Sequence, residues 1–247
     1  MRSLCMNNSK VVVGDLDRQN IFFEKIFRGS QEEEALEKIL EPMILGLKQQ
    51  LVKFPLTIIY LKLRFCGFAY KLFEYHLGSQ QYYPTGAEPI PKNRLFAQYH
   101  SPQTELMKKE ILEQLTSGES KVRIIFATVA IGMGVNVPNI RQVIHIGVPT
   151  SIREYYQEIG RCGRDGHPAK ATLYYNNRDI AKNRPGISDS VRTFCKSEEK
   201  CLRKQLLEYL DAPRVQSRTP GHLCCSVCQV CCSCATTKMI YLYRHET

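Results

Sequence analysis

Apolar residues recur along the chain in two patterns, short β-branched runs and longer stretches with helical spacing. Strands are expected where the runs are four to seven residues long, at residues 10–14, 56–60, 96–99, 122–127, 143–146 and 171–175. Helices are expected where leucine, isoleucine and methionine recur every three or four positions, at residues 36–47, 68–77, 104–115, 152–159 and 191–209. This alternation predicts an α/β fold whose parallel sheet is covered by helices on both faces.

Proline and glycine mark the expected breaks between these elements. Pro42 lies inside the first helical pattern and favours a break or kink there. Residues 80–93 contain three prolines and one glycine and are expected to form a loop. Pro185-Gly186 marks a domain boundary. We therefore expect an α/β domain at residues 1–185, a small helical subdomain at 186–234 and a tail at 235–247.

The composition favours a polyanionic partner. The formal net charge is +10 and the sequence pI is about 9.1, and lysine and arginine gain affinity by displacing counterions from phosphates. No stretch reaches the roughly 20 apolar residues of a membrane span, and residues 1–10 lack the apolar run of a signal peptide. Charge alone therefore leaves nucleic acid as one candidate partner without deciding it, and we expect no association with a membrane.

Six of the 11 cysteines lie between Cys224 and Cys234, which is typical of a metal site in a reducing compartment. Zinc prefers four tetrahedral ligands, and a closed set of thiolates makes the ion structural. The spacing C-x-x-C-x-x-C predicts a structural zinc ion, and the predicted ligands are Cys201, Cys225, Cys228 and Cys231. The remaining candidates that could replace a ligand are Cys195, Cys224, Cys232 and Cys234. The alternative is a cysteine-rich tail that binds no metal.

The segment YYQEIGRCGRDG at residues 155–166 carries the most specific pattern in the chain. Arg161 and Arg164 are spaced so that both guanidinium groups can reach one anion, and Gln157 precedes them. Arginine binds phosphate oxygens with two parallel hydrogen bonds and can stabilise charge on a transferring γ-phosphate. We expect both side chains to face the carboxyl edge of the sheet. The alternative is a basic surface turn whose arginines form ordinary ion pairs.

A second motif, FATVAIGMGVNVP at residues 126–138, begins where an expected strand ends. Thr128, Gly132 and Gly134 follow this strand, and ligands of α/β folds bind beyond the carboxyl ends of strands. The alternative is a plain strand-to-helix loop with two glycines that allow close packing.

These two motifs, in this order and about twenty residues apart, resemble motifs V and VI of superfamily 2 helicases and of their RecQ branch in particular. Residues 17–21 (DRQNI) resemble the family's "RPNI" segment, with Gln19 in place of the proline, and residues 56–60 resemble the strand of motif IV. Residues 201–207 (CLRKQLL) resemble the "C-R-R-x-x-L-L" start of the RecQ zinc module.

The resemblance implies a RecA-like second helicase lobe followed by a helical zinc-binding subdomain. It makes Arg164 the arginine finger, with Arg161 and Gln157 as its catalytic partners, and assigns ATP contacts to Gly132, Gly134, Arg161 and Arg164. It assigns DNA contacts to Thr128 and to Arg64, which stands near the place of an arginine that follows motif IV in the family.

The resemblance also implies an ATP-dependent 3′–5′ DNA helicase that acts on single-stranded or junction DNA in repair and recombination. Nuclear residence is expected from the family type, with the cytoplasm as the alternative. The phosphate cradle G-x-x-x-x-G-K-[ST] is absent from the 247 residues. ATP and Mg²⁺ are therefore expected only together with a first lobe or a full-length helicase as partner. The alternatives are an ATPase-inactive module that binds nucleic acid or a helicase, and an RNA-directed member of the superfamily.

Overall fold

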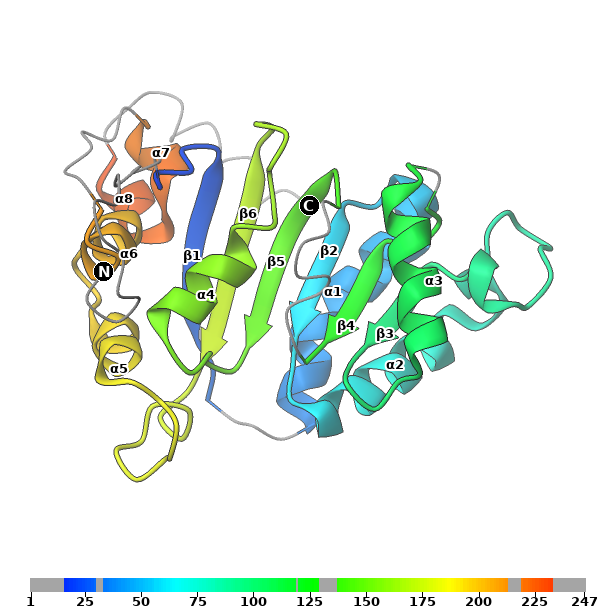
Figure 1. Ribbon diagram of the computed structural model, residues 1–247, viewed down its shortest axis with the longest axis horizontal. Coiled ribbons are helices and arrows are strands. Elements are labelled where there is room, and N and C mark those ends of the chain that lie inside the picture. Colours follow the sequence, from blue (N-terminus) through cyan, green and yellow to red (C-terminus); the bar gives the residue numbers. More distant parts are fainter. Residues whose placement is uncertain (1–15, 30–32, 119, 129–136, 213–218, 233–247) are drawn as a thin grey trace, which may run out of the picture.

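The computed structural model describes residues 16–29, 33–118, 120–128, 137–212 and 219–232. These residues form a six-stranded sheet with the strand order β1-β6-β5-β2-β4-β3, in which every neighbouring pair is parallel (Figure 1). The strands are β1 (Ile21–Phe27), β2 (Leu56–Tyr60), β3 (Phe96–Tyr99), β4 (Ile124–Ala127), β5 (Ile140–Ile146) and β6 (Ala169–Tyr175). The predicted α/β fold with a parallel sheet is confirmed.

The central strands are apolar on both faces because helices cover both faces. Every residue of β2 and of β4 is buried, as expected for a parallel sheet between two helical layers. The edge strand β1 was missed by the sequence analysis, because Glu24 and Lys25 interrupt its apolar run IFFEKIF. The strand expected at residues 10–14 lies outside the described residues.

Helices cover both faces of the sheet (Figure 1). On one face α1 (Glu33–Gln50) and α2 (Leu63–Leu77) enclose a core with Phe73 and Phe126. On the other, α3 (Glu105–Thr116) and α4 (Ile152–Ile159) enclose a second core with Ile125 and Val143. Of the break or kink expected at Pro42, the break does not occur: α1 runs through Pro42, which lies on the exposed side of a helix whose apolar face is buried.

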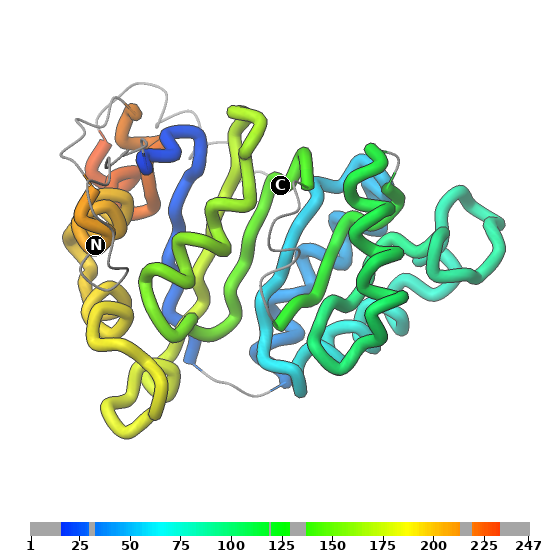
Figure 2. The backbone as a smooth tube through the Cα atoms, viewed as in Figure 1, coloured from blue at the N-terminus to red at the C-terminus, as the bar shows by residue number. Residues whose placement is uncertain are grey.

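The helical stretch expected at residues 191–209 is divided into two helices. These are α5 (Asp189–Lys196) and α6 (Leu202–Tyr209), and two short helices follow, α7 (Gly221–Cys224) and α8 (Ser226–Cys231). The helices α6, α7 and α8 contact β1, and Phe23 of β1 forms a bridge with Cys225. Figure 2 shows the cysteine-rich segment and β1 side by side. The core of this segment is therefore continuous with the core of the sheet.

The loop expected at residues 80–93 projects beyond β3 at the edge of the molecule (Figure 1). Short 3-10 turns occur at Gly78–Gln81 and Pro91–Asn93, and a third, Leu51–Lys53, follows α1. At the base of the loop, the Arg94 guanidinium lies against the rings of Tyr70 and Tyr82. Within the described ranges, no helix combines the length and apolar content that would be needed to cross a bilayer.

Candidate functional site

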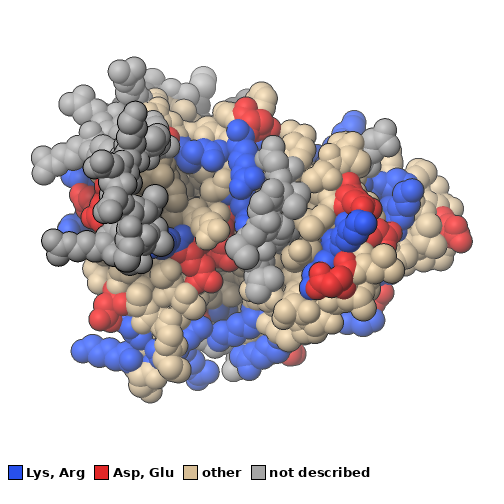
Figure 3. Space-filling view, in the orientation of Figure 1, with Lys and Arg blue, Asp and Glu red and all other residues tan. Residues whose placement is uncertain are grey.

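A cavity of about 350 Å³ opens at the carboxyl edge of the sheet, beyond the ends of β2, β4 and β5. This is the edge at which parallel α/β folds bind ligands. On the face drawn in Figure 3, lysine and arginine side chains gather along the lower border, where the strand arrows of Figure 1 end. The polar lining of the cavity includes Lys62, Thr128, His145, Thr150, Glu158 and Arg184.

A buried hydrogen-bonded pair forms part of the cavity wall. His145 Nε2 lies 2.7 Å from Glu158 Oε2, and the two side chains are only 3% and 8% exposed. The Tyr60 ring stacks on the His145 ring with a centroid separation of 4.7 Å. The pair ties β5 to α4 behind the cavity. The sequence analysis did not single it out, although a histidine inside the apolar run VIHI was a signal that could have found it.

The two predicted DNA contacts have different surroundings. Thr128 lines the cavity, and its backbone amide donates to the Tyr99 carbonyl oxygen at 3.3 Å. Arg64 is exposed, does not line the cavity, and lies over the Phe65 ring at 4.4 Å. Lys62 and Arg184 supply the basic groups of the lining instead. Partial burial, and then the charge of Arg184, lower the pKa of Lys62.

The segment with the paired arginines lies at the opposite edge of the sheet. Ser151 caps the start of α4, with its hydroxyl accepting from the Glu154 amide, and Gly160 is the C-cap. Residues 160–166, called the arginine loop below, then lead back to the start of β6. The Gly163 amide donates to the carbonyl oxygen of Ile140, the first residue of β5, at 2.9 Å. The arginine loop therefore sits at the amino edge of the strands.

The expectation that these arginines face the carboxyl edge is wrong. α4 leaves the carboxyl end of β5 and returns antiparallel to it, so a motif that ends this helix must lie at the amino edge. Arg161 is buried, Arg164 and Gln157 are exposed, and the two arginines border one small hollow beside Val137. Partial burial lowers the pKa of Arg164, and the positive charges of Arg161 and Arg18 lower it further. Like charges are thus gathered at this edge.

Residues just before β1 hold the arginine loop in place. The Arg18 guanidinium donates to the carbonyl oxygens of Gly160, Cys162 and Gly163 at 3.3, 3.2 and 2.6 Å. The Asn20 side chain donates to the Gly163 carbonyl at 2.7 Å. The sequence analysis singled out residues 17–21 only as a resemblance. Their contacts with the loop, more than 140 positions away, could not be read from spacing. Gly132 and Gly134 lie outside the described residues.

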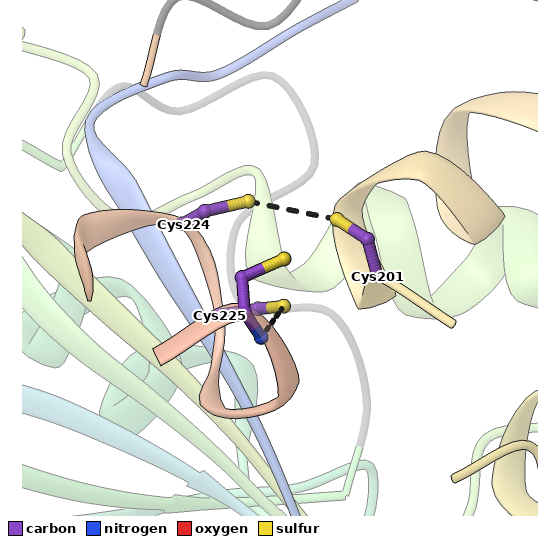
Figure 4. Close-up of side chains that lie close together, drawn as sticks. Cys201, Cys224 and Cys225 are labelled. Atoms are coloured by element: carbon purple, nitrogen blue, oxygen red, sulfur yellow. Dashed lines mark hydrogen bonds between the residues drawn. The ribbon is translucent and has the colours of Figure 1, made fainter. Parts of the chain in front are cut away.

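Four cysteine sulfurs converge beside β1. The Sγ atoms of Cys201, Cys224, Cys225 and Cys228, called the cysteine cluster below, all lie within 4.8 Å of one another. Figure 4 shows the side chains of Cys201, Cys224 and Cys225 turned towards a common point, and the Sγ atoms of Cys201 and Cys224 are 3.6 Å apart. Tetrahedral zinc with bonds of about 2.3 Å places its sulfurs about 3.8 Å apart. The four sulfurs therefore fit such an ion.

The structure brings together three of the four predicted ligands and differs at the fourth. Cys231 is exposed and does not belong to the cluster, whereas Cys224 does. The backbone of Cys225 is extended between α7 and α8, which turns the side chains on both sides of this point towards Cys201. Cys195 is buried elsewhere, and burial raises its pKa to about 12. Hydrogen bonds with Cys201 and Cys224 lower the pKa of the Cys225 thiol, which favours a thiolate at the centre of the cluster.

Comparison with known protein families gives one match, the helicase conserved C-terminal domain, over residues 87–166. The RecQ-like DNA helicase BLM of Xenopus laevis is 29% identical over 181 residues, which cover 66% of this chain and 13% of that protein. R290 of Acanthamoeba polyphaga mimivirus, named as an ATP-dependent RNA helicase, is 36% identical over 127 residues, which cover 46% of this chain and 22% of R290. The chain spans about a fifth or less of the length of such relatives.

Among solved structures, the Mycobacterium smegmatis helicase Lhr bound to ssDNA and AMP-PNP superposes with a TM-score of 0.52 and 16% identity. The match covers 82% of this chain and 23% of Lhr. At this identity the likeness concerns the fold, and it identifies the six-stranded sheet as RecA-like.

Proposed function

We propose that this chain is the C-terminal lobe of a RecQ-type superfamily 2 helicase, and that the lobe completes an ATP-driven DNA motor whose triphosphate is held by another lobe. The observation that carries the proposal is the pairing of Arg161 and Arg164 at a helix end, on a loop that Arg18 and Asn20 fix from outside. Such a loop can keep two guanidinium groups in register for an incoming anion.

The position of the arginine loop at the amino edge differs from the expected one, so the proposal rests on the pairing of the two arginines and not on the edge that they occupy. Ligands cradled by an open α/β sheet bind beyond the carboxyl ends of its strands. A lobe that only adds charge to a triphosphate bound elsewhere can do so from another surface. In the proposed motor, Arg164 stabilises charge on the γ-phosphate and the buried Arg161 orders it. Gln157 lies in α4 just before the arginine loop and would respond to the nucleotide state.

We further propose that a nucleic-acid strand lies along the carboxyl edge, where Lys62, Thr128 and Arg184 line the cavity. The basic side chains supply phosphate contacts, and the Thr128 hydroxyl can add a neutral hydrogen bond. Because the lobe is proposed to be RecQ-type, the proposed substrate is DNA. The proposed direction of movement along the DNA strand is from 3′ to 5′. The two functions then occupy opposite edges of one sheet, so that closure on the nucleotide can shift the strand.

The ion proposed for the cysteine cluster is Zn²⁺, held by Cys201, Cys224, Cys225 and Cys228. Bound zinc would supply folding energy and keep the thiols ionised. Four protein ligands would leave no open coordination position on the ion. Its role would therefore be structural, joining the start of α6 to α7 and α8.

Binding of a labelled single strand, followed by fluorescence anisotropy at several salt concentrations, tests the carboxyl edge. Lys62→Gln should weaken binding and reduce the slope of log affinity against log salt by about 0.7. Lys71→Gln is the matched control, because Lys71 is an exposed lysine of α2 that pairs with Glu74 outside the cavity. Equal binding by wild type and both variants would contradict the proposed strand position. DNA and RNA of one sequence would establish the preferred substrate.

A binding module without motor function is the alternative, and the missing phosphate cradle favours it for these 247 residues. The two hypotheses differ at Arg164. If the arginine loop serves a nucleotide, Arg164→Ala leaves DNA affinity unchanged, whereas in a general basic adaptor this charge contributes to binding. The purified chain alone should show no ATP turnover. Magnesium-dependent turnover by contaminant-free chain would refute the need for a second lobe.

A further inference from the structure

A buried arginine connects the cysteine cluster to the segment that holds the arginine loop. Arg203 lies in α6, two residues after Cys201, and its side chain is 2% exposed. It donates to Asp17 Oδ1 at 2.8 Å, to the Arg18 carbonyl oxygen at 2.7 Å and to the Ile21 carbonyl oxygen at 2.6 Å. A guanidinium this deeply buried is stable only while its charge and donors are matched.

The cysteine cluster fixes the start of the helix that carries this arginine. Cys201, one of the four clustered cysteines, is the N-cap of α6, and Arg203 is the second residue of that helix. A bound metal would hold Cys201 to Cys224, Cys225 and Cys228 and so restrain the first turn of α6, whereas metal loss would release this restraint. The position of the Arg203 guanidinium therefore depends on the cluster.

The other end of the connection is Arg18. Its backbone carbonyl accepts from Arg203, and its side chain donates to three carbonyls of the arginine loop, at Gly160, Cys162 and Gly163. A continuous path thus runs from Cys201 along the first turn of α6 to Arg203, and from there by hydrogen bonds through Arg18 to the backbone around Arg161 and Arg164. Every partner along the path lies in the described part of the chain.

We propose that Arg203 and Arg18 are positioning residues that couple metal occupancy of the cysteine cluster to the conformation of the arginine loop. Any effect of this coupling on ATP turnover rests on the proposed function. The coupling between the cysteine cluster and the arginine loop can be measured in this lobe alone. If Arg203 only filled space in the core, its loss would loosen the lobe evenly. Coupling through Arg18 requires that the arginine loop respond more than the rest of the sheet.

Hydrogen–deuterium exchange of the full chain, read by mass spectrometry, separates these cases. The reporter is the peptide that contains the Gly163 amide, which is bonded to the Ile140 carbonyl. Arg203→Met should speed exchange in this peptide about tenfold or more, since it removes several buried hydrogen bonds, and should leave a peptide from α2 unchanged. Arg28→Met is the matched control, because Arg28 is another buried guanidinium, paired with Asp179 at the far end of β1.

Metal removal gives an independent measurement on the wild-type chain. A chelator should speed exchange at residues 160–166 while α2 keeps its rate, and added zinc should restore protection. Arg18→Gln should produce the same loop response with the metal fully retained. Unchanged loop exchange in Arg203→Met, or equal acceleration in the loop and α2, overturns the proposal. If Arg203→Met fails to fold, the chelator comparison decides. None of these readouts depends on ATP turnover or DNA binding, so the proposed function can fail separately.

Discussion

Gly163→Ala is the sharpest perturbation of the arginine loop. Gly163 has φ +60°, in the left-handed region that side chains with a Cβ rarely adopt. A Cβ at this position would lie 2.5 Å from Asn20 Nδ2, 3.0 Å from Ala169 Cβ and 3.0 Å from the His167 carbonyl oxygen. Two of these neighbours are fixed in β6 or its approach, so Asn20 is the one that must move.

The cost can be worked from these contacts. The left-handed conformation costs alanine about 1 kcal/mol. Displacing Asn20 breaks its bonds to the Gly163 and His167 carbonyls, at 2.7 and 2.8 Å, each worth about 1 kcal/mol. The free energy of unfolding should therefore fall by about 3 kcal/mol, and the Tm by about 9 °C for a lobe of this size.

Gly166→Ala is the matched control, because Gly166 has φ +81° with no atom within 4 Å of an added Cβ. It should lose only the conformational part, about 1 kcal/mol. Urea unfolding followed by far-UV circular dichroism measures both variants against wild type. Equal destabilisation by the two substitutions would refute the reasoning, because it would mean that the contact with Asn20 contributes nothing.

Three further predictions concern the cysteines and the loop's ion pair. Cys224→Ser should weaken zinc binding by about a hundredfold, because one of four thiolates contributes about a quarter of the binding free energy. Cys231→Ser should retain about one zinc per chain. Elemental analysis with a competing chelator distinguishes the two variants, and the opposite result would restore the ligand set predicted from spacing. Iodoacetamide at pH 8 should modify the exposed Cys231 and spare Cys66, because burial raises the pKa of Cys66 to about 12; mass mapping shows which is alkylated. The hydrogen bond from Arg141 holds the pKa of Asp165 well below its usual range. The ionised Asp165 therefore stabilises the fold at pH values above its unfolded-state pKa, and this contribution is lost as the pH falls towards its lowered folded-state pKa. Asp165→Asn should therefore be less stable than wild type at pH 7, with a difference that narrows below about pH 4; a constant difference would contradict the pairing.

Most of the sheet could be predicted because its strands are buried on both faces and read as continuous apolar runs. β1 could not be found in this way. Lys25 interrupts its run, yet its amine donates to the carbonyls of Phe194 and Ser197 at 2.7 and 2.5 Å. Those acceptors lie about 170 positions away, so nothing near Lys25 in the sequence reveals that a strand can accommodate it.

The candidate site was predictable where spacing alone decides which residues share a surface. Arg161 and Arg164 are three positions apart after a helix end, and this spacing lets both side chains border the same hollow. The spacing rule failed at Cys231, because Cys225 and Cys231 stand at opposite ends of α8, about 9 Å apart along the helix. The extended backbone at Cys225 brings Cys224 into the cluster instead. A single backbone conformation thus changed the ligand set while the residue type and the proposed chemistry stayed the same.

The edge occupied by the arginine loop follows from the connection that precedes it. Any motif at the end of a helix that follows a parallel strand must return to the amino edge, whereas a motif directly after a strand stays at the carboxyl edge. Thr128 directly follows β4 and Arg161 follows α4, so these two motifs are separated by the full length of the strands. In the proposed motor, one lobe can therefore contact a nucleic-acid strand and a nucleotide held elsewhere without the two sites competing for the same surface. The sheet joins both edges, so we expect a displacement imposed on the arginine loop to be passed to the carboxyl edge.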